Sequence, residues 1–260
     1  MNDHEIPLQN DTSDAKRFAS HITELAERSL RDQHPCWTDF LEPPEREQAQ
    51  AVLSWTIGIR FNAMGGYSQA ERRRLVIYPD FYFAETIQPE LAFLEIATNS
   101  PAPQNHRDFL GSLMSLGLKR EKIGDLLVSD KGCQVIIVPE LVDFIKTSLE
   151  KVGNSKATII EIDPEQLNLP NQREKEIRAT VASLRLDAIA ALGFSDSRTK
   201  MAREIKALRV KVNWKIVKDP DLAVNPGDII SVRGRGRVIF RELSGRSKKG
   251  RLGIILVRLL

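Results

Sequence analysis

Residues 183–215 constrain the fold of this chain most strongly, because the period of their apolar residues changes within a short stretch. Apolar residues recur at helical spacing up to Gly193, and helical spacing resumes from Met201. From Val210 onwards, apolar and polar residues alternate, which is typical of a half-buried strand. The stretch therefore predicts two short helices followed by a strand.

The turn between the two predicted helices contains residues suited to helix ends. We expect Gly193 to end the first helix in the left-handed conformation that glycine adopts easily. Ser195 and Ser197 are candidate N-caps of the second helix, because a serine hydroxyl accepts a hydrogen bond from a backbone N–H. Basic side chains project from the predicted elements on the side away from the buried residues. This cationic face consists of Arg185, Arg198, Arg203, Lys206, Lys211 and Lys215.

Positive charge is concentrated in the C-terminal third of the chain. Residues 171–260 contain 21 Lys and Arg against 9 Asp and Glu, whereas residues 1–170 contain 17 against 26. The basic third would attract phosphate groups, and the acidic remainder would limit non-specific adhesion to nucleic acid. The distribution therefore favours a phosphate-bearing partner for the C-terminal third.

Several other classes of protein are not supported by the composition. No apolar run approaches the roughly 20 residues that span a bilayer, and the polar N-terminus lacks a signal-peptide core. Cys36 and Cys133 lie far apart and beside no His or Cys cluster, so neither zinc nor a disulfide is indicated. The four histidines are scattered without a nucleophile or base. We expect a monomer in the cytoplasm or the interior of an organelle, with no membrane span, catalytic residue, metal or cofactor.

The order of patterns predicts an α+β protein with three domains. Residues 1–74 read as a helical region, with helices over 16–33 and 45–61. Residues 75–165 read as β-α-β-β-α-β, the order of a ferredoxin-like domain or an RNA-recognition motif (RRM), and its first apolar run is 75–78. A polar linker over 166–180 precedes a basic domain over 181–260.

Four short motifs resemble the pattern of an S4-type, or αL-like, RNA-binding domain. They are Arg-Leu-Asp at 185–187, Ser-Arg at 197–198, Val-Lys-Val-Asn at 210–213 and Gly-Asp at 227–228. The resemblance implies that the domain over 181–260 is an S4 domain with additional C-terminal strands.

Two positions depart from the S4 pattern. Leu208 stands where a glycine usually ends the second helix, and Trp214 stands where a glycine usually follows the asparagine. The second departure predicts a hairpin turn other than the common Asn-Gly type.

Longer strings resemble the YlmH-type RNA-binding proteins over nearly the whole chain. They include TDFLEPPEREQA, GGYSQAERRRL, NHRDFLGSLMSLGLKREKIGDLLV and SKKGR. Cyanobacterial and plastid members of this family are called photosystem II S4 domain proteins. The resemblance implies association with the large ribosomal subunit and with rRNA or tRNA, and a role in ribosome-associated quality control in some bacteria.

Further candidate RNA contacts lie outside the first cationic face. Ser197 could present backbone N–H groups of its helix to a phosphate, and Asp187 is expected to orient a neighbouring arginine. A tryptophan at the hairpin tip could stack on an unpaired base or lie on the domain's own core. Glycines between arginines let a backbone approach phosphate closely. These candidates are Asn213, Trp214, Arg233, Arg235, Arg237, Lys248, Lys249 and Arg251.

We interpret the chain as a non-enzymatic protein that binds structured RNA through phosphate contacts and shape. One alternative is an assembly factor for photosynthetic complexes, in which the basic face binds an acidic protein. Another alternative is an RNA-modifying enzyme whose site is not recognised.

Overall fold

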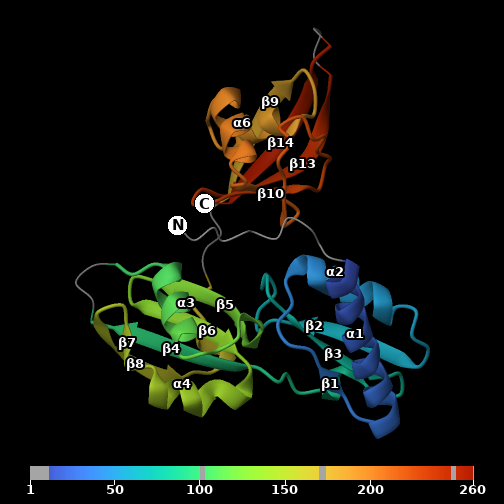
Figure 1. The fold of residues 1–260 in the computed structure, drawn as a ribbon, viewed down its shortest axis with the longest axis vertical. Coiled ribbons are helices and arrows are strands. Elements are labelled where there is room, and N and C mark those ends of the chain that lie inside the picture. Colours follow the sequence, from blue (N-terminus) through green and yellow to red (C-terminus); the bar gives the residue numbers. More distant parts are fainter. Residues whose placement is uncertain (1–11, 100–102, 170–173, 247–249, 260) are drawn as a thin grey trace. The chain divides into compact units, whose positions relative to one another are not determined.

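The computed structural model describes residues 12–99, 103–169, 174–246 and 250–259. The chain forms two compact units, Met1–Leu169 and Pro170–Leu260 (Figure 1). Each unit combines helices with antiparallel sheet, which confirms the expected α+β class. Within the described residues, we find no helix with the length and apolar character needed to cross a membrane.

The first unit begins with two helices and a three-stranded antiparallel sheet. The elements are α1 (Thr12–Asp32), β1 (Cys36–Trp37), α2 (Pro43–Leu53), β2 (Ile59–Met64) and β3 (Arg74–Pro79). The sheet has the order β1-β3-β2. Ile22 and Leu25 of α1 share a core with Leu75 and Ile77 of β3, so the helix covers the central strand.

Two expectations for this region are wrong. The helix expected over 45–61 ends at Leu53, and its last residues belong to β2 instead. Gly58 has a φ of +80° between the two elements, and the many apolar residues after Leu53 fit either period. The run 75–78 lies in β3 and pairs with β1 and β2, so it belongs to the first sheet rather than the central one.

A second sheet completes the first unit. Its elements are β4 (Ala92–Thr98), α3 (His106–Ser115), β5 (Ile123–Ser129), β6 (Gly132–Ile137), α4 (Val142–Ser148), β7 (Lys151–Val152) and β8 (Ser155–Glu161). The five strands are antiparallel in the order β5-β6-β4-β8-β7. The expected sequence of elements is present, and β7 is an additional short strand.

The two faces of this central sheet are covered differently. Phe109 of α3 and Ile145 of α4 share a core with Leu94 of β4, so both helices lie on one face. On the other face, Phe93 and Ile136 pack against Phe40 from the N-terminal region. The central sheet is therefore enclosed between its own helices and the segment that precedes α2.

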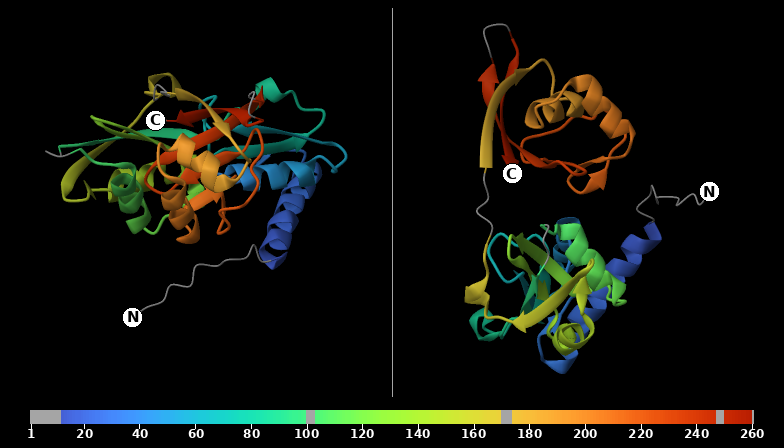
Figure 2. Two further views of the ribbon diagram at one scale, coloured as in Figure 1. Left: turned by 90° about the horizontal axis from the view of Figure 1, so that it is seen from above. Right: turned by 90° about the vertical axis from the view of Figure 1, so that its left-hand side faces the viewer.

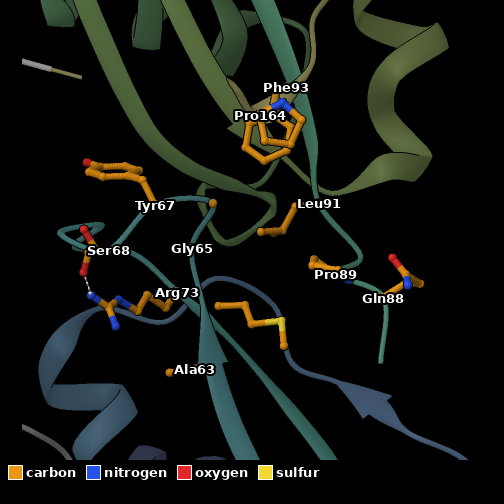
Figure 3. A pocket seen from close by; sticks show the side chains of 12 residues that line it. Ala63, Gly65, Tyr67, Ser68, Arg73, Gln88, Pro89, Leu91, Phe93 and Pro164 are labelled. Atoms are coloured by element: carbon orange, nitrogen blue, oxygen red, sulfur yellow. Dashed lines mark hydrogen bonds between the residues drawn. The ribbon is translucent and has the colours of Figure 1, made fainter. Parts of the chain in front are cut away.

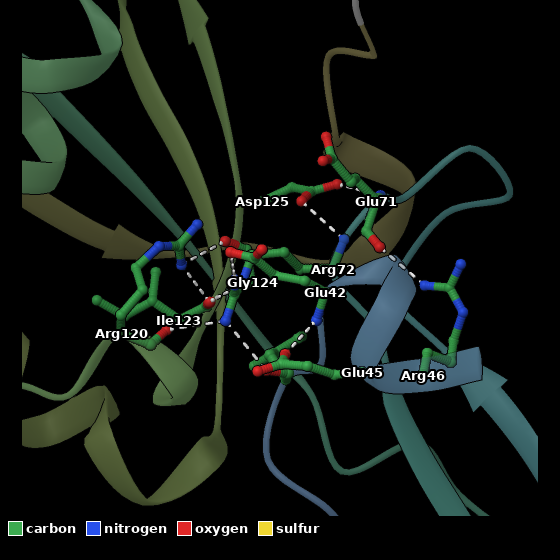
Figure 4. A network of polar contacts seen from close by, with 10 residues as sticks. Glu42, Glu45, Arg46, Glu71, Arg72, Arg120, Ile123, Gly124 and Asp125 are labelled. Atoms are coloured by element: carbon green, nitrogen blue, oxygen red, sulfur yellow. Dashed lines mark hydrogen bonds and ion pairs between the residues drawn. The ribbon is translucent and has the colours of Figure 1, made fainter. Parts of the chain in front are cut away.

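Arg72 joins the N-terminal region to the central sheet (Figure 4). The residue is 7% exposed, and its guanidinium donates to the Glu42 carboxylate at 2.9 Å and to the carbonyl oxygens of Phe40 and Ile123, both at 3.0 Å. Asp125 reinforces the join from the central sheet, because its carboxylate accepts from the backbone N–H of Arg72 at 3.1 Å. One arginine thus satisfies acceptors from both regions.

We predict that Arg72→Met destabilises the first unit by about 3 kcal/mol, because the buried carbonyl oxygen of Phe40 and the Glu42 carboxylate lose a side-chain donor and the carbonyl of Ile123 keeps only Arg120. Urea denaturation of the full chain measures the change. Arg60→Met is the matched control, since Arg60 is exposed on β2 and its replacement should change stability by less than about 0.5 kcal/mol. Equal effects of the two substitutions would contradict the assigned role of Arg72.

The second unit is a six-stranded antiparallel sheet with two helices. Its elements are β9 (Glu174–Val181), α5 (Leu186–Gly193), α6 (Arg198–Lys206), β10 (Val210–Val212), β11 (Lys215–Ile216), β12 (Ile229–Val232), β13 (Gly236–Arg246) and β14 (Leu252–Leu259). The strand order is β11-β10-β12-β13-β14-β9. Figure 2 shows the orange helices beside the yellow and red strands, and Ile189, Ile205 and Val238 share their core.

The C-terminal part of the predicted linker, residues 174–180, is ordered strand. Residues 174–181 form β9 and pair with β14 over eight positions, from Glu174 opposite Leu259 to Val181 opposite Leu252. Ile177 and Val181 face the core, while charged residues alternate with them on the other side. The charged side chains made this edge strand resemble a linker.

The residue with left-handed backbone conformation between α5 and α6 differs from the one expected, which was Gly193. Gly193 is the last residue of α5, and the residue with positive φ is Ser195, at +53°. Packing, rather than backbone conformation, favours glycine at position 193, because a Cβ there would lie only 2.7 Å from the side chain of Val238. Ser197, rather than Ser195, caps α6 by accepting from the N–H of Lys200 at 3.2 Å.

Leu208 occupies a backbone position that favours glycine. Its φ is +58°, its N–H donates to Ile205, and the following N–H of Arg209 donates to Glu204. This pair of bonds is the Schellman motif that ends many helices. The helix end therefore has the usual S4 geometry although the residue is leucine.

We predict that Leu208→Gly is more stable than Leu208→Ala by about 1 kcal/mol, because both substitutions remove the side chain but only glycine removes the left-handed strain. Thermal or urea unfolding of the two variants measures the difference. An alanine variant as stable as the glycine variant would show that φ at this position carries no cost.

Candidate nucleic-acid interface

Asp187 connects two of the arginines predicted to bind RNA. Its carboxylate accepts from Nε and Nη2 of Arg185 at 3.2 and 3.0 Å, and from Nη2 of Arg198 at 3.0 Å. Burial by itself would raise the pKa of Asp187, which is 5% exposed, but these hydrogen bonds lower the pKa below its ordinary value. The expected orienting role of Asp187 is confirmed.

A second carboxylate, Asp196, was not predicted as part of the site. It accepts from Nζ of Lys200 at 3.0 Å, from Nη1 of Arg235 at 2.6 Å and from the N–H of Ser197 at 2.9 Å. These hydrogen bonds lower the pKa of Asp196 to about 2. The i, i+4 spacing of Asp196 and Lys200 is the sequence signal that could have indicated this pair.

The predicted cations consequently fall into two groups. Arg185, Arg198 and Arg235 form ion pairs with carboxylates of the same unit. A second group is exposed on α6, the β10–β11 hairpin and the loop before β13, and makes no ion pair with any other residue that the structure describes. This group consists of Arg203, Lys206, Lys211, Lys215 and Arg233. Its charge is available to an external anion.

The hairpin tip is fixed by the two last motifs of the S4 pattern. Asn213 and Trp214 have φ values of +47° and +64° between paired Val212 and Lys215, which is the geometry of a type I′ turn. The expectation of a different turn type is therefore wrong, although tryptophan replaces glycine. Nδ2 of Asn213 donates to Asp228 at 2.8 Å, so this side chain is occupied in positioning the turn.

The remaining candidates are dispersed over the second unit. Trp214 is partly exposed at the hairpin tip, and Arg237 lies on β13 facing away from the core. Arg251 donates from Nη2 to the carbonyl of Thr180 at 2.8 Å. The predicted contacts Lys248 and Lys249 lie outside the described residues.

The first unit has a pocket of about 500 Å³ that no sequence pattern indicated (Figure 3). Phe93, Leu91 and Pro164 provide apolar surface, and Tyr67 lies across from them. Arg73 borders the pocket with its guanidinium held by the carbonyl of Ser68. Among the residues that the structure describes, no group of three His, Cys, Asp or Glu side chains is placed to bind a metal ion.

We predict that the second unit loses stability in acid partly through Asp196. A carboxylate whose folded pKa is about 2, below the unfolded value of about 3.9, stabilises the fold above that unfolded value. This contribution is lost as the pH falls through the folded pKa. Asp196→Asn should therefore flatten the decline in protection of α6 amides between pH 5 and pH 2.

Hydrogen exchange of the full chain, resolved by peptide, measures that decline. Glu242→Gln removes an exposed carboxylate of β13 from the same unit and should leave the decline as in the unmodified protein. The role of Asp196 is wrong if both variants behave alike.

Three family models match this chain. The model described as "YlmH, N-terminal" matches residues 14–82, "Putative RNA-binding domain in YlmH" matches 90–166, and "S4 domain" matches 184–230. A curated relative, "Ribosome-associated protein quality control protein P2" of Bacillus subtilis (strain 168), is 38% identical over 224 residues, which cover 85% of this chain and 86% of the relative.

A solved structure, "Cell division protein ylmH from Streptococcus pneumoniae", is also similar. It is 20% identical with a TM-score of 0.49, and the match covers 65% of this chain and 99% of that chain.

Proposed function

This chain belongs to the YlmH family and carries an S4 domain, and from this premise we propose that it binds structured RNA through its second unit. The observation that carries the proposal is the set of unpaired cations on α6 and the β10–β11 hairpin. Lys and Arg without carboxylate partners neutralise phosphates and release counterions. Their positions on a short rigid helix and a fixed turn favour a surface matched to one RNA shape.

The two carboxylates give this surface a second property. Asp187 and Asp196 hold Arg185, Arg198 and Arg235 in fixed orientations, at the cost of part of their charge. An oriented guanidinium presents its remaining N–H groups to a phosphate without losing side-chain entropy on binding. Paired arginines would therefore set the register on the RNA, while unpaired cations supply most of the attraction.

The ribosome is the partner that we propose. The relative's name describes a ribosome-associated quality control protein, and we extend that role to this chain, with rRNA of the large subunit and tRNA as the RNA ligands. Such a protein works where ribosomes translate, in the cytoplasm or the plastid stroma. No catalytic step is part of the proposal.

We further propose that the central sheet is RRM-like but contacts RNA differently from an RRM. In an RRM, bases stack on aromatic residues of the open sheet face. Here that face is packed against Phe40 through Phe93 and Ile136. The match to a putative RNA-binding model over 90–166 then favours contacts through loops or edges, or contacts with protein.

We predict that Arg203→Gln combined with Lys211→Gln weakens RNA binding and reduces the slope of log K against log salt by about 2, because two phosphate contacts are lost. These positions are preferable to Arg198, because replacing Arg198 would remove a hydrogen-bond donor from the buried Asp187 and could destabilise the fold. Salt titrations against 23S rRNA fragments, tRNA and an unrelated RNA duplex measure the slope.

Lys16→Gln combined with Arg60→Gln is the matched control, because both side chains are exposed on the N-terminal region of the first unit, outside residues 90–166. The control should retain the slope of the unmodified protein. Weak binding to every RNA with no salt dependence would contradict the proposal and favour a basic surface for acidic protein, as in assembly of photosynthetic complexes.

A further inference from the structure

A pocket of about 250 Å³ lies in the second unit where the end of β9 meets α5. Ala188, Ala191 and Leu192 of α5 supply an apolar wall. Thr180 and Ser183 supply hydroxyl groups, and the two arginines on its lining are Arg198 and Arg251. The volume lies below the range of about 300 to 1,000 Å³ typical of sites for drug-sized ligands, so it fits a single small planar group.

The cations at this pocket are fixed rather than mobile. Arg198 uses only Nη2 to bind Asp187, so its Nε and Nη1 donate to none of the other residues in the described part of the chain. Its side chain is 56% exposed. Arg251 is anchored on β9 through Nε to the hydroxyl of Thr180 at 3.2 Å and through Nη2 to the carbonyl of the same residue. An anion at the rim would meet guanidinium groups from two elements.

The carboxylate on the pocket lining decides how a ligand would enter. Asp196 remains ionised, since Lys200 and Arg235 hold it in that state. A phosphate in the interior would be repelled by this charge, whereas the amino group of a base could donate to it. The arrangement therefore favours an anionic group outside at the arginines and a polar-edged ring inside against the alanines.

We propose that this pocket receives one unpaired nucleotide of the bound RNA, with its base against α5 and its phosphate between Arg198 and Arg251. The inference rests on the proposed RNA-binding function and specifies the RNA that the second unit prefers. Extracting a paired base costs a few kcal/mol, and a base that is already unpaired costs least. A stem with a bulged nucleotide should therefore bind better than a continuous duplex.

Three RNA stem-loops test the inference with the full-length protein. One is fully paired, one has a single bulged adenosine, and one has an abasic residue at the bulge. We expect the bulged RNA to bind about tenfold more tightly than the paired RNA, as for one base held against a protein surface. The abasic RNA should bind like the paired RNA, because the bent backbone alone is not what the pocket recognises.

A pocket-filling variant provides the second measurement. Ala188 lines the pocket and is 9% exposed, but it does not belong to the cluster of core residues shared by the helices and the sheet. Ala188→Leu should therefore fill the cavity, and thermal unfolding of the variant checks that it remains folded. We expect it to bind the bulged and the paired RNA equally. Ala202→Leu adds the same volume to α6 away from the pocket lining and should retain the tenfold preference.

The outcomes separate the two proposals. If the unmodified protein binds all three RNAs with equal affinity and a steep salt dependence, the nucleotide pocket is overturned while RNA binding by the second unit stands. Retention of the preference by folded Ala188→Leu also overturns the pocket. If none of the three RNAs binds at low salt, the proposed function fails, and this inference fails with it.

Discussion

The second unit depends on a negative charge that is almost removed from water. A carboxylate as enclosed as Asp187 is tolerated only when donors surround it, because an isolated buried charge is very costly. Arg185 and Arg198 are those donors, and they tie the start of α5 to the start of α6. The two arginines are thus required by the fold before any RNA is considered. Replacement of either arginine is therefore expected to weaken the contact between the two helices, whatever its effect on the proposed RNA binding.

The first unit also contains a buried charge, but this charge is positive. Arg72 is enclosed between the two sheets and is satisfied by carbonyl oxygens and by Glu42. The guanidinium of Arg120 lies close enough to Arg72, and is sufficiently buried, for burial and the neighbouring charge to lower its pKa to about 10. The carboxylates of Glu42, Glu71 and Asp125 offset this repulsion. The acidic excess of residues 1–170 is therefore partly an internal requirement of the fold.

The spacing of apolar residues was sufficient to predict a helix or strand where one face of that element packs on the core. It was insufficient where the packing depends on residues far away in the sequence. The helices and first strand of the S4 domain were predictable, because Met201, Ile205 and Val210 are buried at regular spacing. The strand β9 was not, since its partner β14 is about 70 residues away and half of its side chains are charged. Asp196 was missed for the same reason, because the position of Arg235 beside it depends on the tertiary fold. The left-handed Leu208 shows that backbone geometry can persist when the residue that usually indicates it is replaced.

The pairing of β9 with β14 has a consequence for synthesis of the protein. β14 lies between β13 and β9 in the sheet and follows both of them in the sequence. The sheet therefore lacks one of its inner strands until β14 has been synthesised, whereas the first unit can fold earlier as an independent compact body. Until then, the helix pair has no complete sheet to cover. The S4 surface is therefore supported by a complete sheet only after β14 has been synthesised and has left the ribosomal exit tunnel.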